Sequence, residues 1–84
     1  MKVLVDIGNT NVLMGKYDNS RLIDQARFET NTVISSPDDI LKSLSIFLAD
    51  VEYVLISGVV PQAQKNLRIL ISKNFENLSI RELN

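Results

Sequence analysis

The sequence predicts a single α/β domain with its elements in the order strand, strand, strand, helix, strand, helix, strand. Short apolar runs rich in β-branched residues, typical of buried strands, occur near the N-terminus, at residues 53–57 and again near the C-terminus. Two longer segments, beginning near residues 36 and 61, carry apolar residues at helical spacing. The length of 84 residues allows one domain at most, with a modest core.

The first two strands are predicted close to the N-terminus. Residues 3–7 are almost continuously apolar, so we expect a strand buried on both faces. Residues 12–17 form the second strand, and the composition of residues 18–20 is typical of a turn. These strands are near enough in sequence to pair as antiparallel neighbours.

The third strand covers residues 21–30, where Leu22, Ala26 and Phe28 are expected to share one face, with Asp24 as an exception. The two later strands follow helices. They are therefore expected to join the sheet as parallel strands through right-handed crossovers.

Each predicted helix begins at a proline. Ser36 is a candidate N-cap, Pro37 takes the first helical position, and the carboxylates of Asp38 and Asp39 suit the positive end of the helix dipole better than a metal site. The apolar stripe of this helix comprises Ile40, Leu41, Leu44, Phe47 and Leu48. The second helix begins near Pro61, and its apolar face comprises Ala63, Leu67, Leu70, Ile71 and Phe75.

Composition excludes several classes of function. Nine Lys and Arg against ten Asp and Glu give a net charge of -1, and the basic residues are scattered, so no nucleic-acid partner is expected. The chain has no cysteine or histidine, which excludes disulfides, thiolate zinc sites and an imidazole base. The apolar runs are shorter than the ~20 residues that span a bilayer, so we expect no membrane association and a cytoplasmic protein.

The segment Asp6 to Asn11, D-I-G-N-T-N, follows the first strand and suits phosphate. Gly8 allows the backbone to approach a ligand closely, and the side chains and N–H groups after it can donate hydrogen bonds. Asp6 cannot bind an anion directly, but its carboxylate can hold Mg²⁺ that bridges to phosphates. A plain hairpin turn explains the same residues. The segment matches neither the P-loop nor the dinucleotide-binding pattern.

Residues 5–11 resemble the N-terminal phosphate motif of type III pantothenate kinases, usually D-[VI]-G-N-T-N. Residues 56–61, I-S-G-V-V-P, resemble a second stretch of that family, commonly S-S-V-V-P, with Gly58 in place of the second serine. Tyr17 and Asp18 match the aromatic and acidic end of the family's second strand. The motifs occur in the family's order and spacing.

The resemblance implies a ribonuclease-H-like fold of the acetate kinase, sugar kinase and actin superfamily. That family holds ATP between two such domains and phosphorylates pantothenate at its hydroxyl, towards coenzyme A. Residues 1–84 then correspond to a truncated N-terminal nucleotide-binding domain. By analogy, Asp6 organises the metal and Asn9, Thr10 and Asn11 touch the phosphates. The ATP phosphate loop implied by the resemblance comprises Asp6, Ile7, Gly8, Asn9, Thr10, Asn11, Val12 and Leu13.

Other parts of the family's site lie beyond the equivalent of Asn84. They include the general base in a G-x-D-R motif, the pantothenate-binding residues, the monovalent-cation site and the second domain. No catalytic residue is therefore assigned here, pantothenate is expected to bind only with the missing half, and little or no kinase activity is expected of this chain alone. Family members are homodimers, so association between copies is expected.

Two alternatives remain open. The chain could be a non-catalytic interaction or dimerisation module that keeps the half-fold, or part of another kinase of the superfamily, such as a sugar kinase. The N-T-N triplet and the V-V-P stretch favour the pantothenate kinase over the sugar kinase. Ser57 and Gly58 are further candidates for the nucleotide cleft, because ligands bind at the carboxyl ends of strands in open α/β sheets.

Overall fold

The computed structural model describes residues 1–83. Its elements are β1 (Lys2–Ile7), β2 (Asn11–Asp18), β3 (Arg21–Glu29), α1 (Thr30–Ser35), the 3-10 helix η1 (Pro37–Ile40), α2 (Leu41–Phe47), β4 (Tyr53–Gly58), α3 (Pro61–Asn74) and β5 (Ser79–Glu82). A mixed α/β sheet of five strands with helices is confirmed. The predicted first helix is divided into η1 and α2, and α1 is an additional helix.

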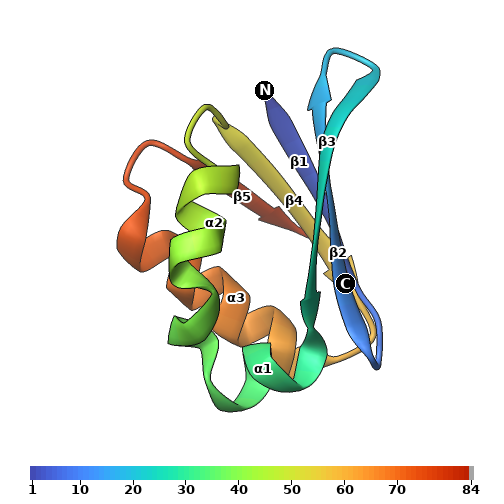
Figure 1. The fold of residues 1–84 in the computed structure, drawn as a ribbon, viewed down its shortest axis with the longest axis vertical. Helices are drawn as coiled ribbons and strands as arrows, with labels where there is room; N and C mark the ends of the chain where they lie inside the picture. Colours follow the sequence, from blue (N-terminus) through green and yellow to red (C-terminus); the bar gives the residue numbers. More distant parts are fainter. Residues whose placement is uncertain (84) are drawn as a thin grey trace.

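The strands form one sheet in the order β3-β2-β1-β4-β5. β1 pairs with β2, and β2 with β3, as antiparallel neighbours, whereas β4 and β5 join as parallel strands on the other side of β1. The predicted pairing directions are therefore confirmed. Figure 1 shows that the helices gather on one side of the sheet. We call the opposite side the open face.

The hydrophobic core lies between the sheet and this single layer of helices. Its fully buried side chains come from β1, β2 and β4 on one side and from the helices on the other; the largest are Ile7, Leu44, Ile56, Leu67 and Ile71. All four apolar residues that the stripe of α3 places within the helix are buried, and Phe75 packs against the core at its end. Within residues 1–83, no helix is both long and apolar enough to cross a membrane.

The prediction that the first strand is buried on both faces is wrong. Val3, Val5 and Ile7 point into the core and are at most 2% exposed. Leu4 is 42% exposed and Asp6 is also exposed. Alternate residues of a strand point to opposite sides, and the described helices cover only one of them. An apolar run therefore did not mean burial on both faces here.

The third strand departs from its predicted pattern at a β-bulge. The register between β2 and β3 shifts at Lys16 and Tyr17, so that Ile23 has no partner and Tyr17 faces Leu22. An extra residue reverses the alternation of side chains. Leu22 therefore lies on the open face, whereas Ala26 and Phe28 pack against the core, contrary to the prediction that the three share a face.

The helix α1 was not predicted, and the predicted third strand extended by one residue into it, to Thr30. Ser36 does precede a helical segment with Pro37 at its first position, but the Ser36 side chain makes no capping hydrogen bond. The end of α1 is instead satisfied from α3, where the Asn66 side chain donates to the carbonyls of Val33 and Ile34, each at 3.0 Å.

A buried lysine lies at the edge of the core, next to the end of α2. Lys16 is only 7% exposed and points to the helix side of the sheet. Its ammonium donates to the Asp50 carboxylate at 2.9 Å and lies 4.8 Å from the centre of the Phe47 ring. The hydrogen bond from Lys16 is the main reason why the pKa of the Asp50 carboxyl lies below its usual value.

Candidate phosphate-binding site

The turn between β1 and β2 is fixed by hydrogen bonds at both of its ends. The Gly8 N–H donates to the carbonyl of Asn11 at 2.9 Å. Thr30, the first residue of α1, donates through its Oγ1 to the Gly8 carbonyl at 2.8 Å and through its N–H to the Thr10 carbonyl at 2.9 Å. Thr30 is 1% exposed, so the turn has a buried anchor. Sequence reasoning missed this residue, because its role depends on a contact 22 positions away.

The predicted loop divides into exposed and buried side chains. Asn9 and Thr10 are exposed at the tip and Asn11 is partly buried, so the polar groups proposed for phosphate are accessible. Ile7 and Val12 are fully buried in the core. These two residues could therefore meet a ligand only through their backbone.

Asp6 and Leu13 lie on the open face, next to each other across β1 and β2. On the other side of Asp6, the parallel register with β4 sets Ser57 beside it. The sheet thus brings together the two candidate segments, which are about 50 residues apart in sequence. The Ser57 hydroxyl makes a long hydrogen bond of 3.4 Å to the Val5 carbonyl.

The surroundings of Asp6 fit a hydrated Mg²⁺. Its carboxylate is exposed and takes part in no ion pair within residues 1–83. No group of three or more acidic side chains that could hold a metal is found in that part of the chain. Magnesium usually keeps several waters and takes one or two carboxylates together with substrate phosphates, and a single exposed aspartate suits that coordination.

The end of β4 packs very closely against the end of β1. Gly58 faces Ile7 in the parallel register, and the Val59 N–H donates to the Ile7 carbonyl at 3.0 Å. A Cβ on residue 58 would lie 2.5 Å from both the Cβ and the carbonyl oxygen of Ile7. The glycine that departs from the family's second stretch therefore occupies a position with no room for a side chain.

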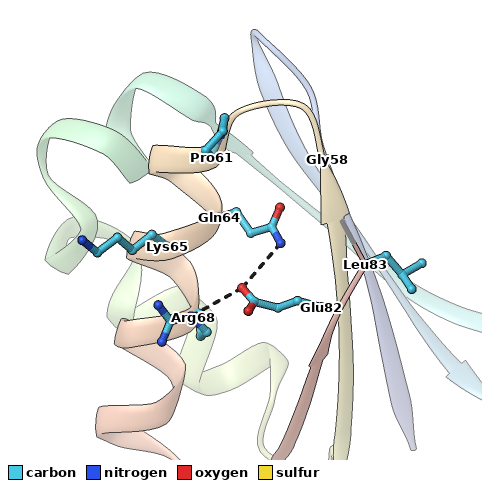
Figure 2. A pocket seen from close by; sticks show the side chains of 7 residues that line it. All are labelled: Gly58, Pro61, Gln64, Lys65, Arg68, Glu82 and Leu83. Carbon is cyan, nitrogen blue, oxygen red and sulfur yellow. Dashed lines mark hydrogen bonds and ion pairs between the residues drawn. The ribbon is translucent and has the colours of Figure 1, made fainter.

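A cavity of about 410 Å³ opens beyond Gly58, between α3 and the end of β5. Figure 2 shows Gln64 and Arg68 of α3 both joined to Glu82 by dashed lines, whereas Lys65 is directed away from Glu82. The Gln64 amide lies 3.5 Å from the Glu82 carboxylate, and the Arg68 Nε lies 3.4 Å from the same oxygen. None of the predicted loop residues lines this cavity.

The fold is similar to that of solved Ppx/GppA proteins. A Ppx/GppA family protein from Aquifex aeolicus superposes with a TM-score of 0.54 at 16% identity, covering 98% of this chain and 34% of that one. A second structure of an Aquifex aeolicus Ppx/GppA enzyme gives a TM-score of 0.52 at 13% identity, covering 96% and 35%. At these identities the likeness concerns the fold alone.

The chain belongs to the type III pantothenate kinase family, whose model matches residues 2–83. A type III pantothenate kinase from Geotalea uraniireducens (strain Rf4) is 34% identical over 68 residues, which cover 73% of this chain. The match spans only 26% of that relative's length. The family assignment inferred from the two motifs is thus confirmed.

Proposed function

We propose that this chain is the ATP phosphate-binding, N-terminal part of a pantothenate kinase, an enzyme that phosphorylates pantothenate with ATP on the way to coenzyme A. Family membership supports the reaction. The turn of residues 8–11, held by buried Thr30 beside the exposed Asp6, is the observation that carries the proposed role of this chain. Because the fold is ribonuclease-H-like in this proposal, ATP lies at the carboxyl ends of β1 and β4.

The turn binds the ATP phosphates through neutral donors. Asn9, Thr10 and Asn11 supply side-chain donors at the tip, and Gly8 lets the backbone come near the ligand. The hydrogen bonds to Thr30 fix the turn before the ligand arrives, so little conformational entropy is lost on binding. Val12 and Leu13 complete the loop by continuing into β2.

Asp6 would hold Mg²⁺ beside the turn. When bound, the ion neutralises phosphate charge and orients the terminal phosphoryl group. The chain contributes the exposed carboxylate of Asp6, which lies at the end of β1 just before the turn. Without that ion, the carboxylate would repel the phosphates.

This chain alone has little or no kinase activity, because phosphoryl transfer requires groups on both sides of the nucleotide. Its match covers about a quarter of the relative's length. Pantothenate, the general base and the monovalent cation belong to the remainder of a full-length enzyme, which we place in the cytoplasm.

The test is a titration of the ¹⁵N-labelled chain with millimolar MgATP, followed by NMR. Amide shifts are expected at residues 8–11, and Asp6→Asn should weaken the Mg²⁺-dependent affinity about tenfold. The control is Asp38→Asn. Asp38 is also exposed but lies on the helix side of the sheet, so this variant should bind MgATP as the wild type does. No shift in the turn, or equal affinity in Asp6→Asn, would contradict the proposed role.

Activity is tested by mixing the chain with a separately produced C-terminal part of a type III pantothenate kinase. Pantothenate-dependent ATP consumption that is lost in Asp6→Ala would support the kinase. A chain that binds no nucleotide, yet associates stably, would favour the non-catalytic module instead.

A further inference from the structure

Asp6 has one polar neighbour across the strands. In the parallel register between β1 and β4 it pairs with Ser57, and in the antiparallel register between β1 and β2 it pairs with Leu13. Residues paired across a sheet point to the same side of it, so these three side chains share the open face. The Leu13 side chain has no oxygen or nitrogen. Ser57 is therefore the flanking residue that could bind the same ligand as Asp6.

The position of Ser57 is fixed by the residues that follow it. Gly58 faces Ile7 so closely that a Cβ would lie 2.5 Å from both the Cβ and the carbonyl oxygen of Ile7. The Val59 N–H then donates to the Ile7 carbonyl at 3.0 Å, so the pairing of β4 with β1 continues past Ser57. Neither Asp6 nor Ser57 can shift along the sheet without breaking these contacts.

The Ser57 hydroxyl has unused capacity as a ligand. It donates to the Val5 carbonyl at 3.4 Å, which is long beside the usual ~2.7–2.8 Å between two oxygens. Within residues 1–83, no hydrogen bond is donated to the Ser57 oxygen, and the side chain is partly exposed. A hydroxyl oxygen has two lone pairs. This oxygen can therefore coordinate a cation while its proton stays directed at Val5.

The carboxylate and the hydroxyl form a donor set that suits Mg²⁺. Both offer hard oxygen ligands, and together they carry one negative charge, which leaves the remaining positions of the ion to phosphates and waters. A neutral hydroxyl that binds a cation needs an acceptor for its proton, and the Val5 carbonyl provides one. The same pair of groups, a Ser or Thr hydroxyl and an Asp carboxylate, holds nucleotide-bound Mg²⁺ in P-loop NTPases.

The spacing of the two strands is compatible with a shared ion. Neighbouring strands lie about 4.8 Å apart. Adjacent oxygens around an octahedral Mg²⁺ with bonds of about 2.0–2.1 Å are roughly 3 Å apart. Asp6 and Ser57 both have short side chains, so small rotations can bring their oxygens to this separation.

We propose that the Ser57 hydroxyl is a second protein ligand, beside the Asp6 carboxylate, for the Mg²⁺ that accompanies ATP. The inference rests on the proposed function of the turn as a phosphate site. With two ligands on neighbouring strands, the location of the ion relative to the turn is set by the pairing of β1 with β4. A single exposed carboxylate would leave a hydrated ion free to move around it.

The test is a change of metal specificity in the untagged chain, which contains no cysteine and no histidine. Ser57→Cys introduces a single thiol, and thiolates favour Zn²⁺ over Mg²⁺. Calorimetry measures the ATP affinity of the wild type, Ser57→Ala and Ser57→Cys with each metal. Both variants should bind MgATP about tenfold more weakly than the wild type. In Zn²⁺, Ser57→Cys should regain at least wild-type affinity, whereas Ser57→Ala should not.

Ser79→Cys is the matched control. Ser79 is exposed and pairs with Tyr53 at the start of β4, so it lies on the same side of the sheet but at the opposite end of the strand from Ser57. Its thiol cannot reach an ion at Asp6, and the ratio of the two affinities should stay at the wild-type value. Thermal unfolding checks the fold. Ser57→Ala should leave the midpoint nearly unchanged, because it removes only one long hydrogen bond.

The outcomes separate this inference from the proposed function. If the wild type binds MgATP through Asp6 but Ser57→Ala binds equally well, the proposed function stands and Ser57 is not a ligand. The same conclusion follows if Ser57→Cys shows no gain in Zn²⁺, or if Ser79→Cys shows the same gain. A wild type that binds no MgATP overturns the proposed function and this inference with it.

Discussion

The buried hydroxyl of Thr30 donates a 2.8 Å hydrogen bond to the carbonyl of Gly8, which ties the start of α1 to the turn between β1 and β2. Thr30→Val keeps the shape of the side chain but leaves the Gly8 carbonyl without this donor. We expect a loss of about 1–3 kcal/mol in the free energy of unfolding, measured with urea. Thr30→Ser, which keeps the hydroxyl, should lose less.

The same substitution should weaken MgATP binding, because the turn would no longer be fixed in advance. Thr32→Val is the matched control within α1, since the Thr32 side chain makes no hydrogen bond among the described residues. Equal stability of Thr30→Val and Thr32→Val would show that the Thr30 hydroxyl does not anchor the turn.

Gly58 cannot carry a side chain without displacing Ile7. Gly58→Ala, and also Gly58→Ser, which would restore the usual family stretch, should therefore lower the free energy of unfolding by about 1–3 kcal/mol. Val59→Ala, at a 69% exposed neighbour, should change it by less than about 0.5 kcal/mol. Urea unfolding measures all three.

A second substitution at Ile7 should not easily remove the clash that a side chain at residue 58 would make. Ile7→Val keeps both the Cβ and the carbonyl oxygen that approach residue 58, so it should not rescue Gly58→Ala. A Gly58→Ala variant as stable as the wild type would mean that β1 and β4 separate at little cost.

The Lys16 and Asp50 pair should respond asymmetrically to substitution. Asp50→Asn leaves the ammonium of a 7% exposed lysine without its carboxylate and should lower the thermal midpoint at neutral pH. Lys16→Met leaves only the half-exposed Asp50, which water can solvate, and should cost less. The reverse order of the two midpoints would contradict this account.

Acid should destabilise the wild type through the same pair. The folded-state pKa of Asp50 lies below its ordinary value, so the pairing contributes stability above that value and loses it as pH falls through the folded-state pKa. The loss is expected below about pH 4. Thermal midpoints of wild type and Lys16→Met should therefore converge as the pH is lowered through this range.

Asn19 adopts a left-handed backbone conformation, with φ of 57°, in the tight turn between β2 and β3. Asn19→Ala should destabilise the fold by about 1 kcal/mol, because a Cβ without a polar group is disfavoured there. Asn19→Gly should be neutral or slightly stabilising. Ser20→Ala serves as the neighbouring control, and identical midpoints for the two alanine variants would contradict the argument.

The sequence predicted the elements whose signals are local. Pro61 and the apolar stripe behind it located α3, and the predicted turn at residues 18–20 lies where β2 and β3 meet. α1 was missed because its stability depends on Asn66, which satisfies carbonyls more than 30 residues away. The bulge at Ile23 was missed for the same reason, since it exists only in the register with β2.

In the candidate site, too, the features with a local sequence signal were predicted and those that depend on tertiary contacts were not. The D-I-G-N-T-N segment identified the turn and its polar side chains from sequence alone. The placement of Ser57 beside Asp6, and the buried support from Thr30, come from tertiary pairing that no local pattern encodes. Burial of Ile7 and Val12 follows from their alternation with open-face residues once the helix layer is known.

The hydrogen bonds from Asn66 to the end of α1 have a consequence for amide hydrogen exchange. The Asn66 Oδ1 accepts a hydrogen bond from Gln62 while its amide donates to α1, and α1 begins with the threonine that secures the turn. These contacts link the middle of α3, α1 and residues 8–11 in series. Their amides should therefore open as one cooperative unit, with a shared opening free energy distinct from that of the β2 and β3 hairpin tip. A nucleotide that orders the turn would then slow exchange in α3, because the six-residue helix α1 is hydrogen-bonded to both.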